Sequence, residues 1–304
     1  MQVFLTGATG YIGSAVLDAL LRAGHHVRAL VRDPEKAAAV VRRRAEAILG
    51  DLQKPSSYAA AAAECEAIVH TAFERAKRGP RVDRLAIETL LAAARRRAAA
   101  GGPAAVIYTS EVWVLGATQG RATEEAPVNP TPLVAWRPEH ERLVLEANRD
   151  NVRTAVVRPG IVYGGAHGII GDMLKDADNG LLRVVGDGTN HWPCIYHRDL
   201  ADLYVRLVGS PDAAGVFHAN DEADERVIDI VEAIAAHARR RPDVRHVPLQ
   251  EARVKMGSYA DALALDQIVG SPRARAIGWA PALHSVARNV ARIVEEFRAT
   301  REAA

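Results

Sequence analysis

The chain contains only two cysteines, Cys65 and Cys194, and they lie far apart in its 304 residues. Two separated thiols do not suggest the disulfide framework of small secreted proteins, so a reducing compartment is expected. No apolar run approaches the roughly 20 residues that a helix needs to cross a bilayer. The first residues, MQVFLTG, run straight into a strand pattern without a charged leader. We therefore expect a cytoplasmic protein that is neither targeted nor inserted into a membrane.

An excess of charge of one sign is also missing. Thirty-nine Lys and Arg residues oppose 37 Asp and Glu residues, which leaves a formal net charge of +2. The whole-chain field therefore gives no reason to expect nucleic acid or a membrane surface as a partner, and a small-molecule substrate is expected instead. The chain also lacks a Ser-His-Asp elbow, a Walker loop and an H-E-x-x-H segment, and with them the usual sequence signs of three large enzyme classes.

What the chain does have is a regular alternation of strand-like and helix-like segments. Hydrophobic residues make up 49% of the sequence and charged residues 25%, as in an ordinary globular protein. Strands that alternate with helices imply right-handed crossovers and a doubly wound parallel sheet, so the predicted fold class is α/β. The predicted strands are 2–6, 26–31, 47–49, 67–71, 105–108 and 153–157, and the helices between them include 12–23, 34–44, 81–100 and 137–148.

After Pro159 the sequence changes to Gly-rich loops, GGAHG and VGDGTN, with short elements between them. We predict a nucleotide-binding domain over 1–165 and a smaller C-terminal α/β substrate-binding domain over 166–304. The segments 197–207 and 215–219 could return a helix and a strand to the first domain. Later helices are predicted over 227–239, 259–268 and 283–298.

The strongest local motif is Gly7-Ala8-Thr9-Gly10-Tyr11-Ile12-Gly13, which follows a strand and opens a helix. Glycines at this spacing let the chain turn tightly and approach a pyrophosphate, which rests against the helix N-terminus. A tight structural turn is the alternative explanation of the glycines. Because strand, helix and second strand are all in place, the motif favours a dinucleotide site and a Rossmann-type sheet.

The end of the second strand, Arg32-Asp33, bears on the choice of cofactor. An acidic residue at this point binds the adenosine ribose of NAD, whereas an arginine suits the extra phosphate of NADP. Arg32 favours NADP, while Asp33 keeps NAD possible. A solvated pair that opens the next helix is the third possibility.

Two more strand ends fit a nucleotide groove. Asp51 and Leu52 follow the third strand and could place a carboxylate and an apolar side chain beside the adenine, although Asp51 could also cap a helix. Thr71 and Ala72 end the fourth strand, where small side chains would let the backbone approach the cofactor. His70 is expected to be packed or capped.

Several motifs together resemble one family, the extended short-chain dehydrogenase/reductases, also called the NAD-dependent epimerase/dehydratase family. Besides GATGYIG and GDL they are TSEVWVLG, RPGIVYG, HRDLA and IGWAP, which begin at Thr109, Arg158, His197 and Ile277. The resemblance implies a Rossmann domain, a small substrate domain and a homodimer packed through helices near 81–100 and 137–148. It also implies that the nicotinamide lies against Pro159, Ile161 and Val162.

Family members commonly use a Ser or Thr, a Tyr, and a Lys four residues after the Tyr. Counted from Val114-Leu115-Gly116, these positions fall on Glu111, Trp136 and His140, so all three usual residues are replaced. The indole of Trp136 can donate a hydrogen bond but does not titrate. Glu111 and His140 do titrate, and either could transfer the proton while Ser110 or Trp136 holds the substrate oxygen.

Plainer explanations remain open for the same residues. His140 and Glu141 could pair with Arg137 or Arg142 on a helix surface, and Trp136 could be a packing residue. Glu111 beside an apolar run needs a partner or water.

Two further groups in this half of the chain have chemical potential. Tyr163, which follows the segment expected to border the nicotinamide, is a possible substitute acid. His191, Cys194 and His197 are possible metal ligands within seven residues. Because the resemblance makes them substrate-pocket lining, no metal site is expected.

Two classes of function follow from these observations. The first is an NADP-preferring oxidoreductase, or an epimerase or dehydratase, that acts on a carbonyl or hydroxyl of a small organic molecule with non-standard proton delivery. The second is a catalytically silent NADP(H)-binding regulatory or sensor protein, suggested by the loss of the usual three residues. A complete substrate cap favours the enzyme.

Overall fold

The computed structural model describes residues 1–149 and 151–302. Its centre is a parallel sheet of seven strands in the order β12-β7-β5-β4-β1-β2-β3. The predicted α/β fold with a doubly wound parallel sheet is confirmed. The strands are β1 (Gln2–Thr6), β2 (His26–Val31), β3 (Glu46–Leu49), β4 (Ala67–His70), β5 (Ala105–Thr109), β7 (Arg153–Pro159) and β12 (Gly215–Ala219).

Helices cover both faces of this sheet, because its central strands are apolar on both sides. In β1, Val3 and Leu5 belong to the apolar cluster on one face and Phe4 to the cluster on the other. The first face packs against α1 (Tyr11–Arg22), α2 (Pro34–Arg42) and α7 (His197–Gly209), and the second against α3 (Ala59–Ala63), α4 (Gly79–Ala99) and α5 (Arg137–Glu146).

The direction of winding reverses between β1 and β4. The chain proceeds from β1 through β2 to β3 on one side, and from β4 through β5 and β7 to β12 on the other. All strands are parallel, so their carboxyl ends meet at one edge. In open α/β sheets, ligands bind in the crevice outside this edge at the point of reversal.

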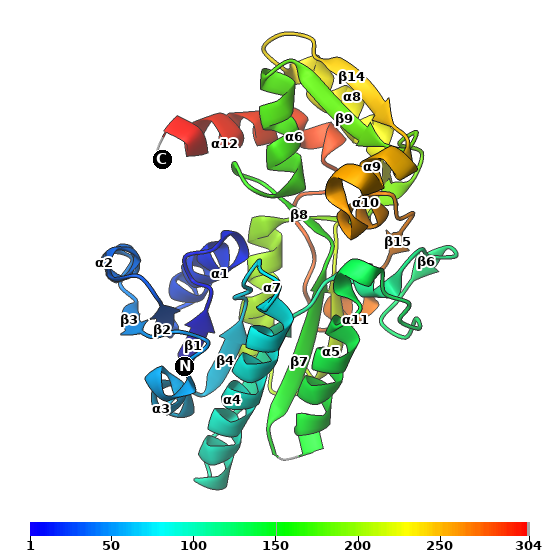
Figure 1. Ribbon diagram of the computed structural model, residues 1–304. Helices are drawn as coiled ribbons and strands as arrows, with labels where there is room; N and C mark the ends of the chain where they lie inside the picture. The colour runs from blue at the N-terminus through cyan, green and yellow to red at the C-terminus, as the bar shows by residue number, and fades with distance from the viewer. Residues whose placement is uncertain (150, 303–304) are drawn as a thin grey trace.

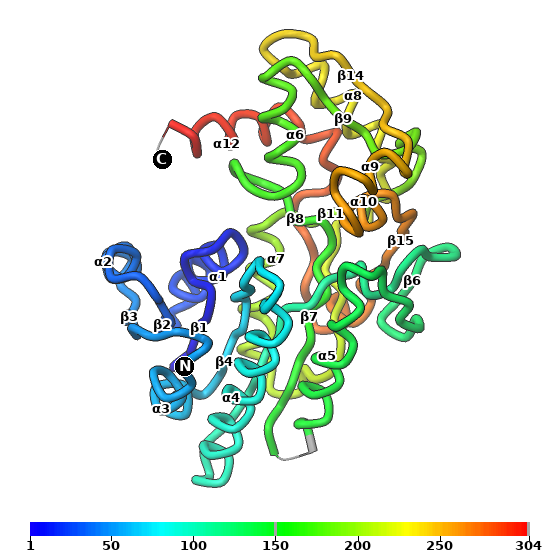
Figure 2. Tube along the Cα trace, viewed as in Figure 1, coloured from blue at the N-terminus to red at the C-terminus, as the bar shows by residue number. Residues whose placement is uncertain are grey.

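Most of the remaining elements form a cap above the sheet in Figure 1, and the trace in Figure 2 shows its green, yellow, orange and red segments gathered together. The strands β8 (Ile161–Tyr163) and β11 (Cys194–Tyr196) pair where the cap meets the sheet. The other elements are β6 (Arg121–Ala122), α6 (Gly168–Asp178), β9 (Leu181–Val185), β10 (His191–Trp192), β13 (Glu225–Arg226), α8 (Val227–His237), β14 (Asp243–Val247), α9 (Leu249–Met256), α10 (Ser258–Leu263), β15 (Ile268–Val269), α11 (Pro272–Ala276) and α12 (Val290–Glu302). The short helix α11 instead packs beside the sheet strand β12.

Two late helices differ from the sequence prediction. The helix predicted over 283–298 begins only at Val290, after a short 3-10 turn, because Ser285 has a left-handed backbone with φ 70°. The backbone amides before it donate to side-chain carboxylates instead of forming a helix. The helix predicted over 259–268 ends at Leu263, and its last part forms β15 beside β6.

Candidate active site

The glycine turn between β1 and α1 packs directly against the end of β4. Gly7 has a φ of +78°, and a Cβ there would lie 2.7 Å from the Thr71 hydroxyl and from the Ala72 amide nitrogen. A Cβ on Gly13 would lie 2.1 Å from the Gly7 carbonyl oxygen. Both positions therefore require glycine, and the turn lies at the reversal point of the sheet.

The first turn of α1 presents free backbone donors. Gly10 is the N-cap without a side-chain cap, and the first helical turn contains no acidic residue. Thr9 and Gly10 are exposed, while Ile12 is half-buried. The positive end of the helix dipole is therefore available to an anion.

Tyr11 ties this turn to the cap. Its hydroxyl donates a 2.8 Å hydrogen bond to the carbonyl oxygen of Gly164, just after β8. Burial raises the pKa of Tyr11 well above its usual value, and the electrostatic effects of Tyr196 and Glu296 raise it further. The phenol therefore stays protonated and links the glycine turn to the segment that follows β8.

Arg32 and Asp33 have separate environments at the end of β2. The Asp33 carboxylate accepts from the Glu35 amide at 2.9 Å and caps α2. The exposed Arg32 side chain makes no hydrogen bond or ion pair with the residues that the structure describes. The carboxylate is committed to a helix cap, and the guanidinium is available to a ligand.

The other predicted cofactor residues follow strand ends along the same edge. Asp51 accepts from the Gln53 amide at 2.9 Å in a local turn, and Leu52 packs against the core beneath it. The Thr71 hydroxyl donates to the Thr6 carbonyl, and the Ala72 amide donates to the Thr6 hydroxyl.

The segment after β7 is fixed between the sheet and the cap. Pro159 and Ile161 are buried, and Val162 is half-buried. The Ile161 amide donates to the Pro193 carbonyl at 2.7 Å. Ser110 is buried after β5, and its hydroxyl oxygen is enclosed without a hydrogen-bond partner among residues 1–149 and 151–302.

Glu111, Trp136 and His140 stand at the three positions where the family has its catalytic residues. Each contacts a residue from another part of the chain. Glu111 accepts from the Arg137 Nε at 2.6 Å. His140 is 4% exposed and shares a 2.7 Å hydrogen bond between its Nδ1 and an Asp83 oxygen. Trp136 stacks on Phe73 with ring centroids 5.3 Å apart, and its ring meets that of His140 edge to face. The proposed pairing of His140 with a surface arginine is therefore wrong.

Asp83, on α4, is the centre of a buried polar network. Besides His140 it accepts from the Tyr108 hydroxyl at 2.8 Å, and it lies 3.3 Å from the Nε2 of His70. Burial raises the pKa of Asp83, but the hydrogen bonds from His140 and His70 outweigh it and hold that pKa well below its usual range. Burial also raises the pKa of Tyr108 well above its usual value. Asp83 is therefore an ionised acceptor and Tyr108 a protonated donor.

Arg137 joins this network to Glu111. Its Nη1 donates to the Tyr108 hydroxyl at 2.8 Å and to the Thr109 carbonyl at 3.1 Å. Its guanidinium carbon lies 4.3 Å from the Trp136 ring centroid and 5.2 Å from that of Phe73. Hydrogen bonds and aromatic rings together hold the guanidinium in place.

Glu141, on the same helix, is also buried, contrary to the surface pairing considered above. It accepts from the Nε and Nη2 of Arg158 at 3.0 and 2.6 Å, and both side chains are at most 5% exposed. This two-point ion pair fastens α5 to β7.

Tyr163 lies in the apolar core of the cap, away from these residues. It is fully buried, and its hydroxyl donates to Asp221 at 3.3 Å and to the Leu283 carbonyl at 3.4 Å. Burial and the Asp221 charge raise the pKa of Tyr163 far above its usual value. This placement gives the phenol a packing and hydrogen-bonding role in the cap.

Asp221 itself predicts a pH-dependent stability. It is 1% exposed, and burial, with the Glu225 charge, raises its pKa from 3.8 to about 7. Between these values the folded state holds a proton that the unfolded state has released. The free energy of unfolding should therefore fall as pH rises from about 4 to about 7, by roughly 4 kcal/mol at about 1.4 kcal/mol per unit.

Urea denaturation at several pH values checks this, with Asp221→Asn as the variant. The variant should lose that part of the pH dependence, whereas Asp212→Asn, at an exposed aspartate, should keep it. Parallel pH curves for the wild type and Asp221→Asn would contradict the prediction.

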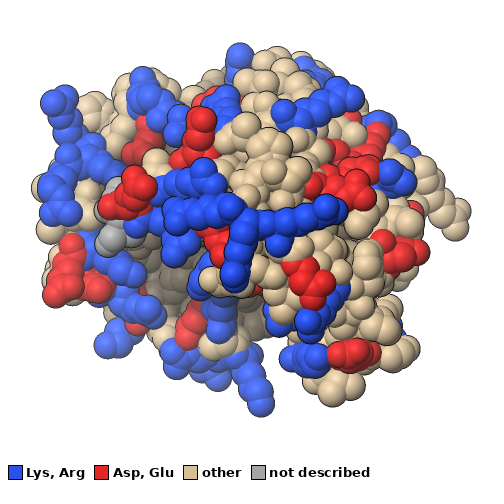
Figure 3. Space-filling view, turned by 90° about the horizontal axis from the view of Figure 1, so that it is seen from above, with Lys and Arg blue, Asp and Glu red and all other residues tan. Residues whose placement is uncertain are grey.

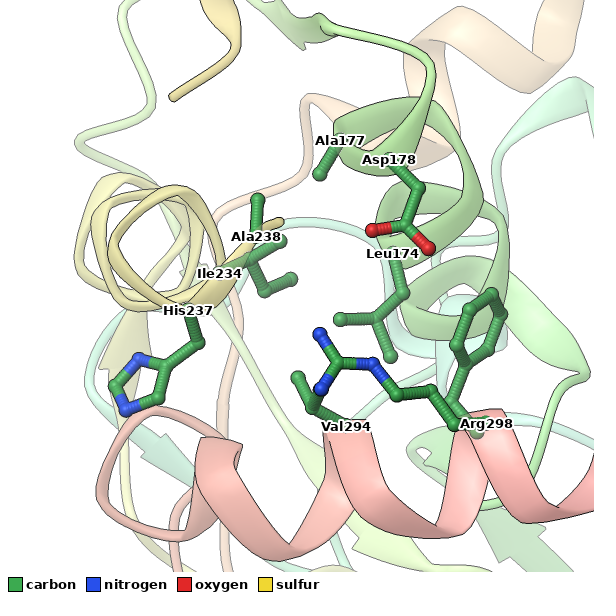
Figure 4. A pocket seen from close by; sticks show the side chains of 9 residues that line it. Leu174, Ala177, Asp178, Ile234, His237, Ala238, Val294 and Arg298 are labelled. Atoms are coloured by element: carbon green, nitrogen blue, oxygen red, sulfur yellow. The ribbon is translucent and has the colours of Figure 1, made fainter. Parts of the chain in front are cut away.

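Two hollows can be seen in the protein, one at the surface and one inside the cap. Seen from the cap side, the surface is hollowed near its centre, with Lys and Arg side chains on both sides of the hollow (Figure 3). Figure 4 shows a separate recess inside the cap, where Arg298 on α12 points between α6 and α8, and no predicted site residue lines it.

In the described chain, no group of three His, Cys, Asp or Glu side chains could hold a metal ion, and no helix is long and apolar enough to span a bilayer.

Sequence reasoning missed Phe73, Asp83 and Arg137 as members of this site. Asp83 had a detectable signal, because it follows Val82 on a helix face that continues through Ala86 and Leu90, and a carboxylate on such a face needs a partner. Arg137 directly follows the Tyr position, and Phe73 directly follows Ala72. Neither has a spacing that marks it.

Relatives of known structure and sequence resemble the whole chain or large parts of it. An uncharacterized protein of Schizosaccharomyces pombe is 29% identical over 293 residues, which cover 92% of this chain and 95% of the relative. A 4-hydroxy-2-methyl-3-oxo-4-farnesyl-3,4-dihydroquinoline-1-oxide ketoreductase of Stigmatella aurantiaca is 34% identical over 58% of this chain and 55% of its own length. The UDP-glucose 4-epimerase of Thermus thermophilus, solved with NAD, superimposes with a TM-score of 0.81 at 20% identity over 98% of this chain and 99% of that one.

The sequence profile of one family spans the sheet and the site described above. It matches residues 3–219, which include the glycine turn, the Asp83 network and β12. The chain belongs to the NAD dependent epimerase/dehydratase family.

Proposed function

We propose that the protein is an NADP-dependent oxidoreductase that acts on a carbonyl or hydroxyl of a small organic molecule and transfers the proton through His140. The observation that carries this proposal is the hydrogen bond between His140 Nδ1 and the buried Asp83 carboxylate. It fixes the ring and leaves Nε2, which has no partner in the described chain and is not among the enclosed polar atoms. An imidazole oriented by a carboxylate, with its second nitrogen accessible, is suited to acid and base work.

The residues present fit the cofactor. The glycine turn accepts no side chain at Gly7 or Gly13 and ends at an uncapped helix, as a pyrophosphate site requires. Arg32 supports NADP in preference to NAD, because its guanidinium has no partner in the described chain while Asp33 is occupied as a helix cap. A bound nicotinamide supplies or accepts the hydride.

The protein side of the reaction is proton transfer at one oxygen. In reduction, protonated His140 donates from Nε2 to the carbonyl oxygen, and Asp83 stabilises the imidazolium through Nδ1. In oxidation, the neutral ring removes the hydroxyl proton at the same nitrogen. The Ser110 hydroxyl is enclosed, so it does not suit the binding of the substrate oxygen.

Glu111 has a different place in this proposal. Its ion pair with Arg137 makes its carboxylate a hydrogen-bond acceptor. It therefore suits the binding of a substrate hydroxyl better than donation of a proton. The ketoreductase activity named for the Stigmatella aurantiaca relative supports the assignment to carbonyl chemistry.

Arg32→Ala should weaken NADPH binding by about tenfold or more while NADH binding changes little, because only NADPH carries the phosphate that Arg32 would pair with. Titration of the protein with both reduced cofactors measures this. Arg22→Ala, on α1, is the matched control and should affect neither. Equal losses for both cofactors would remove the case for NADP.

Turnover separates the enzyme from the sensor alternative. Absorbance of the reduced cofactor should fall when aldehydes, ketones or enones are added. Tight NADPH binding without turnover of any of them would favour a regulatory protein. The homodimer through α4 and α5 and the cytoplasmic location stay predictions.

A further inference from the structure

An aromatic surface lies at the position where the family places its catalytic phenol. The Phe73 and Trp136 rings are parallel to within 8° at 5.3 Å, and Phe73 remains 41% exposed. One ring follows β4 and the other precedes α5, so segments far apart in sequence build it. Leaving a large apolar side chain exposed has a cost, and an exposed Phe73 stacked on a half-buried Trp136 beside the proposed reaction centre points to a ligand.

The surface is held in one orientation. Arg137 contacts both rings with its guanidinium, and that guanidinium is fixed by Glu111, Tyr108 and Thr109. The Trp136 and His140 rings also meet edge to face, with 4.8 Å between their centroids. A ring stacked on this pair would therefore lie next to the imidazole that transfers the proton.

A second aromatic pair comes from the other side of the site. Trp113, after β5, meets Tyr259 on α10 edge to face at 6.1 Å. Tyr259 lies within electrostatic range of Arg75, two residues after Phe73, and of Asp172 on α6. Tyr259 on α10 therefore brings a second aromatic pair near the loop that carries Phe73.

We infer that the substrate is a flat aromatic or conjugated carbonyl compound that stacks on Phe73 and Trp136, an inference that rests on the proposed oxidoreductase function. Stacking binds flat rings in preference to puckered ones of the same size. The carbonyl oxygen then faces His140 Nε2. A sugar, which is puckered and rich in hydroxyl groups, matches this surface poorly.

The test compares acetophenone with cyclohexyl methyl ketone, which share the reacting group and differ in the flatness of the ring. Binding of each to the NADP-loaded protein is measured by equilibrium dialysis, and turnover by oxidation of NADPH. Acetophenone should bind about three- to tenfold more tightly, with a correspondingly lower KM. Phe73→Leu and Trp136→Leu should abolish that preference, and Trp136→Phe should retain most of it.

The outcomes distinguish a failure of this substrate inference from a failure of the proposed oxidoreductase function. Equal binding of the two ketones with turnover of both would overturn the substrate class and leave the oxidoreductase intact. Binding of neither ketone to a protein that holds NADP would also overturn it. Loss of NADPH affinity in Phe73→Leu and Trp136→Leu would assign the pair to the cofactor instead. Val254→Ala, at an exposed residue of α9, should leave every measurement unchanged.

Discussion

Replacement of His140 by alanine is expected to lower kcat by about 10²-fold to 10⁴-fold, the usual contribution of a positioned acid or base. The affinity for NADPH should change much less, because the glycine turn and Arg32 hold the cofactor elsewhere. Stopped-flow or steady-state oxidation of NADPH with the best ketone measures kcat. The control is His246→Gln, at an exposed histidine of β14.

Asp83→Asn tests the same assignment through a positioning residue. The amide cannot hold the Nδ1 proton as the carboxylate does, so kcat should fall even though the side chain keeps its size. Steady-state oxidation of NADPH measures the loss, and the affinity for NADPH should change little, because the glycine turn and Arg32 hold the cofactor elsewhere.

A structural role alone would lower stability without this loss of kcat. Tyr108→Phe removes another hydrogen bond to Asp83 but keeps the carboxylate beside His140, so it should lower stability with little loss of kcat. If His140→Ala and Glu111→Gln both retain kcat within about threefold of the wild type, against the larger loss expected for an acid or base, non-standard proton delivery through either residue is wrong.

The regular part of this fold could be predicted because its signals are local. Strands buried on both faces are near-continuous apolar runs, and β1, with Val3, Phe4 and Leu5 all buried, shows why. The glycine turn was predictable because Gly7 and Gly13 lie beside backbone that allows no Cβ. The sequence located Arg32 and Asp33 at the cofactor site but could not decide which of them faces a ligand. That choice depends on the hydrogen bond from the Glu35 amide to Asp33, which forms only because α2 begins there.

The cap was harder to predict because long-range contacts set its element boundaries. The late start of α12 results from Asp199, Asp221 and Glu225, which lie elsewhere in the chain and accept hydrogen bonds from the amides of residues 283, 285, 286 and 287. A periodic pattern of apolar residues gives no information about these carboxylate partners. It predicts a helix through Ser285, where the backbone is left-handed.

The same limit applies to the candidate site. Counting from a motif located Glu111, Trp136 and His140, but their partners are Arg137 on α5, Phe73 after β4 and Asp83 on α4. Asp83 lies 57 residues before His140, and no spacing rule connects the two. What the sequence could state was that Glu111 needed a partner, and Arg137 is that partner.

The buried ion pair between Glu141 and Arg158 is expected to have the largest effect on stability. Glu141→Leu should lower the free energy of unfolding by about 3–5 kcal/mol, because it leaves the Arg158 charge buried without its partner. Among the described residues Arg158 has no carboxylate partner other than Glu141, and its Nη1 is enclosed and unpaired. Urea denaturation measures the change, and a shift to a lower midpoint at unchanged slope is expected.

The helix α5 offers a matched control, because it also carries an exposed ion pair. Arg142 and Glu146 bond at 2.7 Å, but each is at least half exposed. Glu146→Leu should therefore cost less than about 1 kcal/mol. The double replacement of Glu141 and Arg158 by leucine should recover much of the loss, because it removes both buried charges and fills the space with apolar atoms. If Glu141→Leu costs no more than Glu146→Leu, the packing of α5 on β7 does not depend on this ion pair.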